Sequence, residues 1–506
     1  MFLDLDVGNL VEPISGRRWS QADVHHEIAK RIARFQRHGL GRGQRVFMPF
    51  GNRLEFFAEL LAIWRLGACA VPIDARLTAF EISTLVTAAA PFLAVVDDAT
   101  DSTVVDALAA AGVTTCNTLD TGDETATAGL SQLDDDALIL FTSGSTGAPK
   151  GVVHTHRSLR ARWMSLRDHL GVEAFVRTLC MLPTHFGHGL ICNSLFPWLA
   201  GQDLYITPPF RPDIIMKLGA LIDEHRITFM SSVPSIWRLA LKMARPPQGG
   251  SLQRVHCGSA PLSSHVWDSI RQWTGTQQVC NAYGITETGS WVAGLNDAGC
   301  AAEDGLIGQG WGAVIKVLRT DDTSAPLDSS MQCAVGESGF VWLNTPALMK
   351  GYFQRDDLTS KAVVDGWFLT GDIGFLDERG QLVLRGRERD EINKGGMKIY
   401  PSDVDAVVER FEHASDVCTF ALDDEIYGQT VAMAVVLTQQ DDDTIRALHK
   451  WMVAHLAEPK MPQRWWIVTD IPRTSRGKIN RDQVKAFCLE QVPLDLVTIL
   501  SGGARV

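Results

Sequence analysis

Helical patterns and short apolar strand patterns alternate along most of the chain, and this alternation limits the possible fold more than any other feature. In Phe56–Leu66 the apolar residues recur at helical spacing, and the strand pattern Ala70–Ile73 follows after Gly67. Phe92–Val96 and Ala137–Phe141 are further short apolar runs. Helices that connect consecutive strands bring those strands side by side in the same direction. The sequence therefore predicts an α/β fold with a largely parallel sheet.

A dense run of charged residues, Arg385–Glu391, interrupts this alternation after the strand pattern Gly380–Leu384. The pattern then restarts with two helical and two strand segments, Ser402–Phe411, Thr444–Leu456, Val417–Leu422 and Val431–Leu437. At about 100–200 residues per domain, a chain of 506 residues holds several folding units. We predict a large N-terminal domain over residues 1–386 and a small α+β C-terminal domain over residues 387–506. A charged surface turn inside one domain is the alternative.

The overall charge is acidic, because 47 Lys and Arg residues face 59 Asp and Glu residues and leave a net charge of −12. This balance argues against nucleic acid or an anionic membrane as the main partner. No apolar run approaches the about 18 residues of a membrane-spanning helix, and the start, Met1–Asp6, carries acid where a secretory signal carries base. The ten cysteines are scattered without a Cys-x-x-Cys pair. They predict free thiols and a cytoplasmic protein.

The stretch Phe141–Val152 has the composition of a phosphate-binding loop. It places four hydroxyl residues and three glycines within ten positions, directly after an apolar strand pattern. Glycines let backbone N–H groups converge on an anion, hydroxyl groups add donors, and Lys150 adds a positive charge. The loop is not a Walker A motif, because no Gly-Lys-Ser/Thr ends it. A plain flexible loop is the alternative on composition alone.

The order of residues in this loop resembles the phosphate loop of the adenylate-forming superfamily, which includes acyl- and aryl-CoA ligases, adenylation domains of peptide synthetases and luciferases. Five further motifs resemble the family's motifs and follow in the family's order: Leu66–Asp74, Asn281–Gly289, Trp367–Asp372, Gly386-Arg387 with Lys394–Gly396, and Pro472–Ile479. The resemblance spans most of the chain, from about residue 40 to about residue 490.

The resemblance implies ATP and Mg²⁺ as the nucleotide substrate and its metal. Glu287 and Thr146 are then the expected magnesium ligands, and Lys478, Thr146 and Glu287 the expected catalytic residues. The expected ATP-binding residues are Thr142, Ser143, Gly144, Ser145, Thr146, Gly147, Lys150, Ser259, Ala260, Asn281, Ala282, Tyr283, Gly284, Thr286, Asp372 and Arg387.

The implied reaction is the attack of a carboxylate on the α-phosphate of ATP, with pyrophosphate leaving. Both partners are anions, so the site has to screen their repulsion. One cation at about 4 Å contributes about 4 kcal/mol at an effective dielectric constant near 20, roughly a thousandfold in rate. By resemblance Lys478 is that cation, and the Asp372 carboxylate suits the ribose hydroxyls as a double acceptor.

A second step is implied in which a thiol attacks the acyl adenylate. For this step the resemblance implies rotation of the C-terminal domain about the hinge residue Arg389, and a thiol tunnel beside Lys394, Gly395 and Gly396. Arg389 departs from the family, which usually has Asp or Lys at this position, and Asn393 stands where several relatives have Lys. The thiol belongs either to CoA or to the phosphopantetheine of a carrier protein, since both use the same residues.

The expected acid pocket consists of His185, Phe186, Gly187, His188, Cys257, Gly258, Ser290 and Trp291. Pro183–Leu190 contains no Asp to pair with an ammonium group, which argues against amino acids as substrates. The segment is most similar to that of benzoate and anthranilate CoA ligases. His188 either hydrogen-bonds a ring substituent or only packs in the pocket wall, and Trp291 limits the pocket's depth.

These features together predict an AMP-forming acid–CoA ligase that acts on a ring-bearing or medium-size carboxylic acid. A free-standing enzyme that loads an acyl- or peptidyl-carrier protein is the alternative within the same chemistry. A nucleotide-binding scaffold without catalysis is the alternative of another class, and the presence of Lys478, Glu287 and Asp372 argues against it. The motifs leave the oligomeric state open.

Overall fold

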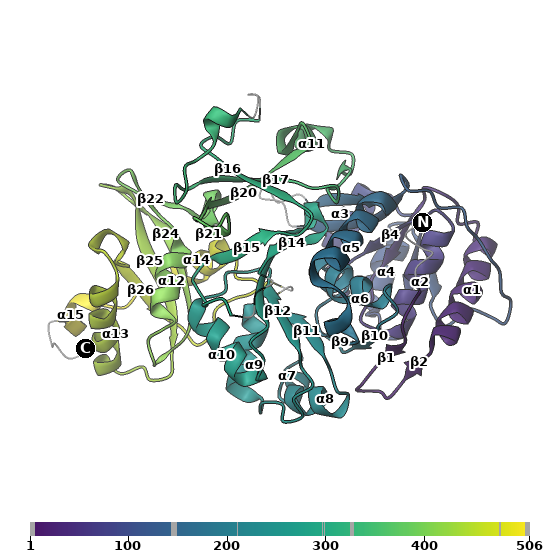
Figure 1. Cartoon of the computed structure of the whole chain (residues 1–506), viewed down its shortest axis with the longest axis horizontal. Coiled ribbons are helices and arrows are strands. Elements are labelled where there is room, and N and C mark those ends of the chain that lie inside the picture. Colours follow the sequence, from purple (N-terminus) through teal and green to yellow (C-terminus); the bar gives the residue numbers. More distant parts are fainter. Residues whose placement is uncertain are drawn as a thin grey trace.

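The computed structural model describes residues 6–142, 149–209, 211–295, 297, 299–323, 328–474 and 477–500. Within these ranges the strands form sheets of 14, seven and five strands, and helices pack against them (Figure 1). The predicted α/β class is confirmed. No helix in the described ranges is both long and apolar enough to cross a membrane.

The seven-stranded sheet carries the predicted parallel arrangement. Its strand order is β18-β8-β7-β4-β3-β5-β6, and the five strands from β7 to β6 run parallel. Helices α2 (Leu54–Arg65), α3 (Ala79–Ala89) and α4 (Ser102–Ala110) connect its consecutive parallel strands. The strands are β3 (Arg45–Met48), β4 (Cys69–Pro72), β5 (Leu93–Val96), β6 (Thr114–Asn117), β7 (Asp136–Thr142), β8 (Lys150–Thr155) and β18 (Gly351–Tyr352).

The 14-stranded sheet is parallel in only one half, where β1, β10, β9, β11, β12 and β13 are neighbours. Its parallel half is built from β1 (Leu10–Val11), β9 (Arg177–Cys180), β10 (Asp203–Ile206), β11 (Phe229–Ser232), β12 (Arg254–Gly258) and β13 (Val279–Ile285), with β2 (Arg18–Trp19) antiparallel at the edge. Its main helices are α5 (His156–Leu170), α6 (Phe196–Trp198), α7 (Pro212–Ile215), α8 (Leu218–Glu224), α9 (Pro234–Met243) and α10 (Ser264–Thr274).

The other half of this sheet is antiparallel, which corrects the prediction of a largely parallel sheet. Between β13 and β21 the described chain has one α-helix, α11 (Asp356–Ala362), so most neighbouring strands follow each other without the crossover helix that a parallel pair needs. The strands are β14 (Ser290–Gly294), β15 (Leu306–Gly310), β16 (Val314–Leu318), β17 (Gly339–Asn344), β19 (Val363–Val364), β20 (Trp367–Leu376) and β21 (Leu382–Arg387).

The chain after Arg387 forms the five-stranded sheet with its own buried core. Figure 1 shows this part at the left, where α12 packs beside β21. We call the chain up to β21 the large part and the chain from β22 onward the small part. The small part contains β22 (Ile392–Lys394), β23 (Met397–Ile399), α12 (Pro401–Val408), β24 (Ala414–Asp424), β25 (Gly428–Leu437), α13 (Asp442–His455), β26 (Arg464–Ile467), α14 (Arg481–Leu489) and α15 (Leu496–Leu500).

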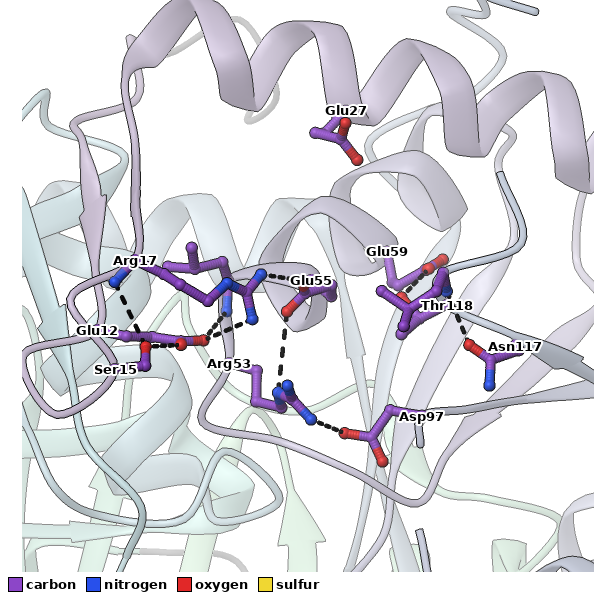
Figure 2. A network of polar contacts seen from close by, with 12 residues as sticks. Glu12, Ser15, Arg17, Glu27, Arg53, Glu55, Glu59, Asp97, Asn117 and Thr118 are labelled. Atoms are coloured by element: carbon purple, nitrogen blue, oxygen red, sulfur yellow. Dashed lines mark hydrogen bonds and ion pairs between the residues drawn. The ribbon is translucent and has the colours of Figure 1, made fainter. Parts of the chain in front are cut away.

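A buried charge network fastens α1 (Gln21–Arg37) to α2. The Glu59 carboxylate has no exposed surface and accepts hydrogen bonds from Arg31 (3.0 Å), Arg34 and the Thr118 hydroxyl (2.6 Å). Figure 2 shows Glu59 facing Thr118, which follows β6. Because a buried carboxylate is stable only with such partners, the network holds the outer helix in one position against the sheet.

Replacing this buried carboxylate with an amide is expected to destabilise the fold. The variant Glu59→Gln leaves the buried Arg34 guanidinium without its counter-charge and removes one of the two carboxylates that pair with the buried Arg31. We therefore expect a loss of about 3–5 kcal/mol in unfolding free energy. Chemical denaturation followed by circular dichroism measures this loss. The control is Glu124→Gln, because Glu124 is 71% exposed where it pairs with Arg37. Equal midpoints for the two variants would contradict the structural role of Glu59.

Candidate active site

The ends of several strands from both sheets of the large part converge on one region, which the small part closes. Ligands of open α/β sheets bind outside the carboxyl ends of parallel strands. Here these ends are Ser232, Gly258 and Ile285, at the ends of β11, β12 and β13. The β7–β8 hairpin adds Thr142 and Lys150, which are paired in register. Five predicted residues of the hairpin loop, Ser143, Gly144, Ser145, Thr146 and Gly147, lie outside the described residues.

Lys150 and Glu287 meet through a tyrosine. The Tyr352 hydroxyl donates a hydrogen bond of 2.8 Å to Glu287 Oε1, and Lys150 Nζ lies 5.6 Å from the centre of the Tyr352 ring. His154 Nε2, 2.8 Å from the Thr286 carbonyl oxygen, fixes the segment before Glu287 against β8. The pair places a cation and a carboxylate beside the predicted phosphate loop. This set suits Mg²⁺ with phosphates, since that ion needs only one or two protein carboxylates when phosphate oxygens supply further ligands.

Asp372 lies in a second cluster, where β13, β20 and β21 meet. Asp372 is 4% exposed, and its carboxylate accepts a hydrogen bond from the Tyr283 hydroxyl and lies 3.0 Å from Arg387 Nε. Burial and the neighbouring Asp372 charge raise the pKa of Tyr283 well above its usual value, so the phenol stays protonated as a donor. Arg387 and Asp372 are cross-strand partners in the β20–β21 pairing. The cluster therefore presents an oriented carboxylate beside a cation.

Lys478 reaches this region from the small part. Its Nζ atom lies 5.3 Å from the centre of the Phe186 ring, within the range of a cation–π contact. Backbone hydrogen bonds between Thr474 and Lys478 (2.8 Å), and from Gly477 to Thr474 (2.8 Å), shape the loop that carries the lysine. The Ser235 hydroxyl of α9 donates a bond of 2.9 Å to the Gly477 carbonyl oxygen. A lysine distant in the sequence is thus held at the mouth of the predicted acid pocket.

His188 is buried between two serines at the start of a π-helical segment, His188–Leu195. Its Nδ1 lies 2.9 Å from Ser259 Oγ, and its Nε2 lies 2.6 Å from Ser231 Oγ. Burial, with a smaller contribution from the Lys478 charge, lowers the pKa of His188 to about 3. The ring is therefore neutral at physiological pH, and both of its nitrogens have hydrogen-bond partners.

The remaining predicted pocket residues line the same wall or support it. Phe186 contacts His188 with ring centres 5.9 Å apart, and Trp291 also contacts His188, with ring centres 5.4 Å apart. Ser259 and Ser290 have φ angles of 68° and 73°, in the left-handed region that costs a non-glycine residue energy. Gly187, Cys257, Gly258, Ala260, Ala282 and Gly284 belong to the segments that carry these residues.

Two of the predicted site residues, Asn281 and His185, contact parts of the chain outside this wall. The side-chain amide of Asn281 donates to the Leu306 carbonyl oxygen at 2.9 Å. His185 Nε2 lies 3.5 Å from the Asp74 carboxylate, which also binds Arg76. Asn281 thus joins β13 to β15, which lies beyond β14 in the sheet, and His185 connects the pocket segment to the chain after β4.

The residues predicted for the thiol step have contacts within the small part. Lys394 Nζ lies 3.3 Å from the Pro459 carbonyl oxygen and 5.8 Å from the Tyr427 ring centre. Gly395 and Gly396 form the turn between β22 and β23, with φ angles of 59° and 89°. Arg389 is exposed and lies between the two parts of the chain. In this conformation Lys478 contacts the acid pocket, while the contacts of Lys394 are to its own part.

Sequence reasoning missed the residues that hold the two parts together. Arg238 of α9 forms an ion pair with Glu409, which caps α12, and Arg410 pairs with Asp304. It also missed Tyr352 and Ser231, which position Glu287 and His188. None of these residues stands in a motif with characteristic spacing, so only the folded chain reveals them.

Several buried histidines are expected to make the folded state less stable at acidic pH. Burial lowers the pKa of His154 and His156 to about 4 and that of His188 to about 3, against about 6.5 in the unfolded chain. The unfolded state therefore binds more protons below pH 6.5, and stability falls as the pH falls. We expect each histidine to remove about 2 kcal/mol between pH 7.5 and pH 5.

Urea denaturation at the two pH values measures this dependence. The variant His154→Gln is expected to flatten it by about one histidine's share. An unchanged slope in this variant would contradict the assignment of His154 as a buried neutral ring.

Comparison with known proteins agrees with this geometry. The chain is 29% identical over 502 residues to the long-chain-fatty-acid–CoA ligase FadD13 of Mycobacterium tuberculosis, covering 96% of each chain. It is 26% identical over 496 residues to the 2-succinylbenzoate–CoA ligase of Listeria innocua, covering 95% of this chain and 97% of that protein. Its structure resembles ATP-bound MatB from Rhodopseudomonas palustris, with a TM-score of 0.84, 25% identity and 96% coverage of both chains.

Family models match both parts of the chain. The model described as AMP-binding enzyme matches residues 9–353, and the model described as AMP-binding enzyme C-terminal domain matches residues 403–478. The first match alone covers more than half of the sequence. The predicted family is confirmed: this chain belongs to the AMP-binding enzymes.

Proposed function

We propose that this protein is an AMP-forming carboxylic acid–CoA ligase. It joins an acid to the α-phosphate of ATP with release of pyrophosphate, and then transfers the acyl group to a thiol with release of AMP. The observation that carries the proposal is the position of Lys478, which the small part places over Phe186 at the mouth of the acid pocket. The names of FadD13 and of the 2-succinylbenzoate ligase support CoA as the acceptor.

The Lys150–Glu287 cluster and the Asp372–Arg387 cluster would bind different regions of the nucleotide. Lys150 and Glu287, with the hairpin loop, would bind the phosphates and their Mg²⁺. Asp372 would accept hydrogen bonds from the ribose hydroxyls, while Arg387 holds its carboxylate in position. The ATP bound to the similar MatB structure supports ATP as the nucleotide of this chain.

In the first step the acid would lie along the Phe186–His188 wall with its carboxylate toward Lys478. The ammonium group would offset the repulsion between the carboxylate and the α-phosphate, and a charge developing on the phosphate oxygens would strengthen this attraction. His188 would act as a neutral polar wall, since its low pKa keeps it uncharged. The pocket wall formed by Phe186, His188 and Trp291 suits a ring-bearing or medium-size acid.

In the second step the chain that follows the hinge residue Arg389, within the predicted C-terminal domain of residues 387–506, would rotate as one body. The exposed turn with Lys394, Gly395 and Gly396 would then approach the pocket and line the path of the thiol. The absence of side chains on the two glycines leaves room for an extended pantetheine arm. The ten free cysteines fit the predicted cytoplasmic location.

Removal of the lysine separates the two steps. We expect Lys478→Ala to slow acid-dependent ATP–pyrophosphate exchange by about 10²–10⁴. Transfer of a supplied acyl adenylate to CoA should change only a few-fold, because that step does not need the ammonium group. Lys450→Ala, on an exposed face of α13, is the matched control. An equal loss of both steps would contradict the role assigned to Lys478, and ADP as the nucleotide product would contradict the proposed function.

The interface between the two parts is expected to affect the first step selectively. In Glu409→Gln the largely buried Arg238 loses its counter-charge, which weakens the conformation that places Lys478 in the pocket. We expect exchange to fall about tenfold, while transfer from the acyl adenylate falls less. Glu412→Gln is the control, because Glu412 is 81% exposed at the same end of α12. Exchange at the wild-type rate in Glu409→Gln would show that the ion pair does not position the lysine.

A further inference from the structure

A column of aromatic rings leads inward from Lys478. The Phe186 ring lies under the lysine, His188 follows with ring centres 5.9 Å apart, and Trp291 follows His188 at 5.4 Å. Behind Trp291 lies His256 at 4.6 Å, and behind His256 the Trp311 ring is stacked at 5.6 Å. An acid whose carboxylate faces Lys478 would therefore extend toward Trp291.

The end of this column is closed. Trp291, His256 and Trp311 are each 1% exposed, and Phe229 packs against both Trp291 and His256. Rings that are buried and in direct contact leave no continuous space for an alkyl chain between them. The space available to the acid therefore ends at His188 and Trp291.

The backbone prevents Trp291 from moving aside easily. The backbone N–H of Trp291 donates a hydrogen bond of 3.3 Å to Cys192 Sγ, and this bond joins Trp291 to the His188–Leu195 segment. The preceding Ser290 has a φ of 73°, and its carbonyl oxygen lies so near Gly284 that an added Cβ there would stand 1.9 Å away. The close backbone approach at Ser290 and the edge-to-face contacts of the indole with His188 and His256 therefore restrict its movement.

The chemical character of the pocket's end is neutral. Within the described residues no carboxylate accepts a hydrogen bond from His188, His256 or Trp291, and the partners of His188 are the hydroxyls of Ser231 and Ser259. An ammonium group at this depth would have no counter-charge from these rings. The pocket thus suits an uncharged body of limited length.

From this geometry we propose that Trp291 is the specificity-determining residue for acid length, and that the substrate is a short acid no longer than a single ring beyond its carboxylate. This inference rests on the proposed ligase function and narrows its substrate class. It separates the chain from FadD13, whose name gives long-chain fatty acids as substrates. In a pocket that can lengthen, each added methylene raises kcat/KM about fourfold through burial. In this pocket kcat/KM should stop rising at hexanoate and should fall for longer acids.

The test measures kcat/KM in acid-dependent ATP–pyrophosphate exchange for benzoate, cyclohexanecarboxylate, hexanoate, decanoate and dodecanoate. The wild type should favour the ring acids and hexanoate over dodecanoate by at least about 100-fold, as the fourfold gain per methylene is lost and steric exclusion is added. Trp291→Ala should raise kcat/KM for decanoate at least tenfold and lower it for benzoate. Trp291→Leu, which removes less volume, should shift the optimum in the same direction if the alanine variant is unstable.

The matched control is Trp311→Leu, which removes an indole from the same column one layer behind His256. It should leave the order of acids unchanged. A wild type that prefers decanoate, or folded Trp291 variants with the wild-type order of acids, would overturn the length limit while the ligase function stands. No exchange with any acid in the wild type would overturn the proposed function and the length limit with it.

Discussion

The small part carries Lys478 and the large part carries the predicted acid pocket, so the distance between the two depends on the interface between the parts. Arg238 and Glu409 form an ion pair across this interface, Arg410 and Asp304 form a second, and Ser235 binds the loop that carries Lys478. Burial raises the pKa of Glu409, and the Arg238 charge opposes this shift. Such a pair is stable only while both parts are in contact. The position of the ammonium group is therefore a property of the interface and not of the lysine loop alone.

The large part supplies a fixed frame for that contact. The 14-stranded sheet carries Trp291 of the predicted acid wall on β14 and the Asp372–Arg387 pair on β20 and β21, so both belong to one hydrogen-bonded sheet. The seven-stranded sheet adds Lys150 from β8, and Tyr352 from the edge strand β18 joins it to Glu287. Three groups that we propose to bind different regions of one nucleotide, Asp372, Lys150 and Glu287, are thus oriented by separate strands. This agrees with preorganisation, in which polar groups are held in place before the reaction begins.

Much of this arrangement could be predicted from the sequence because the motifs are local. The helix predicted at Phe56–Leu66 is α2, and the strand patterns before residue 142 and after residue 413 correspond to β4, β5, β7, β24 and β25. The order of the motifs along the chain identified the family and indicated Lys150, Glu287, Asp372 and Lys478 as candidate site residues.

The antiparallel half of the large sheet was not predicted, because the prediction rested on strands that alternate with helices, and between β13 and β21 the described chain has only one α-helix. Sequence reasoning also failed to predict Tyr352, Ser231 and the Arg238–Glu409 pair. Their partners lie 65, 43 and 171 residues away, and one sequence alone carries no signal of such distant contacts.

The division of the pocket between elements has an evolutionary consequence. The proposed acid wall ends on Trp291 of β14, whereas the carboxylate proposed to bind the sugar lies on β20 and the cation proposed to bind the phosphates lies on β8. Because the strained backbone at Ser290 resists displacement, a lineage can change its substrate most readily by exchanging the single side chain that follows. Nucleotide chemistry would be inherited intact while the acid diversifies.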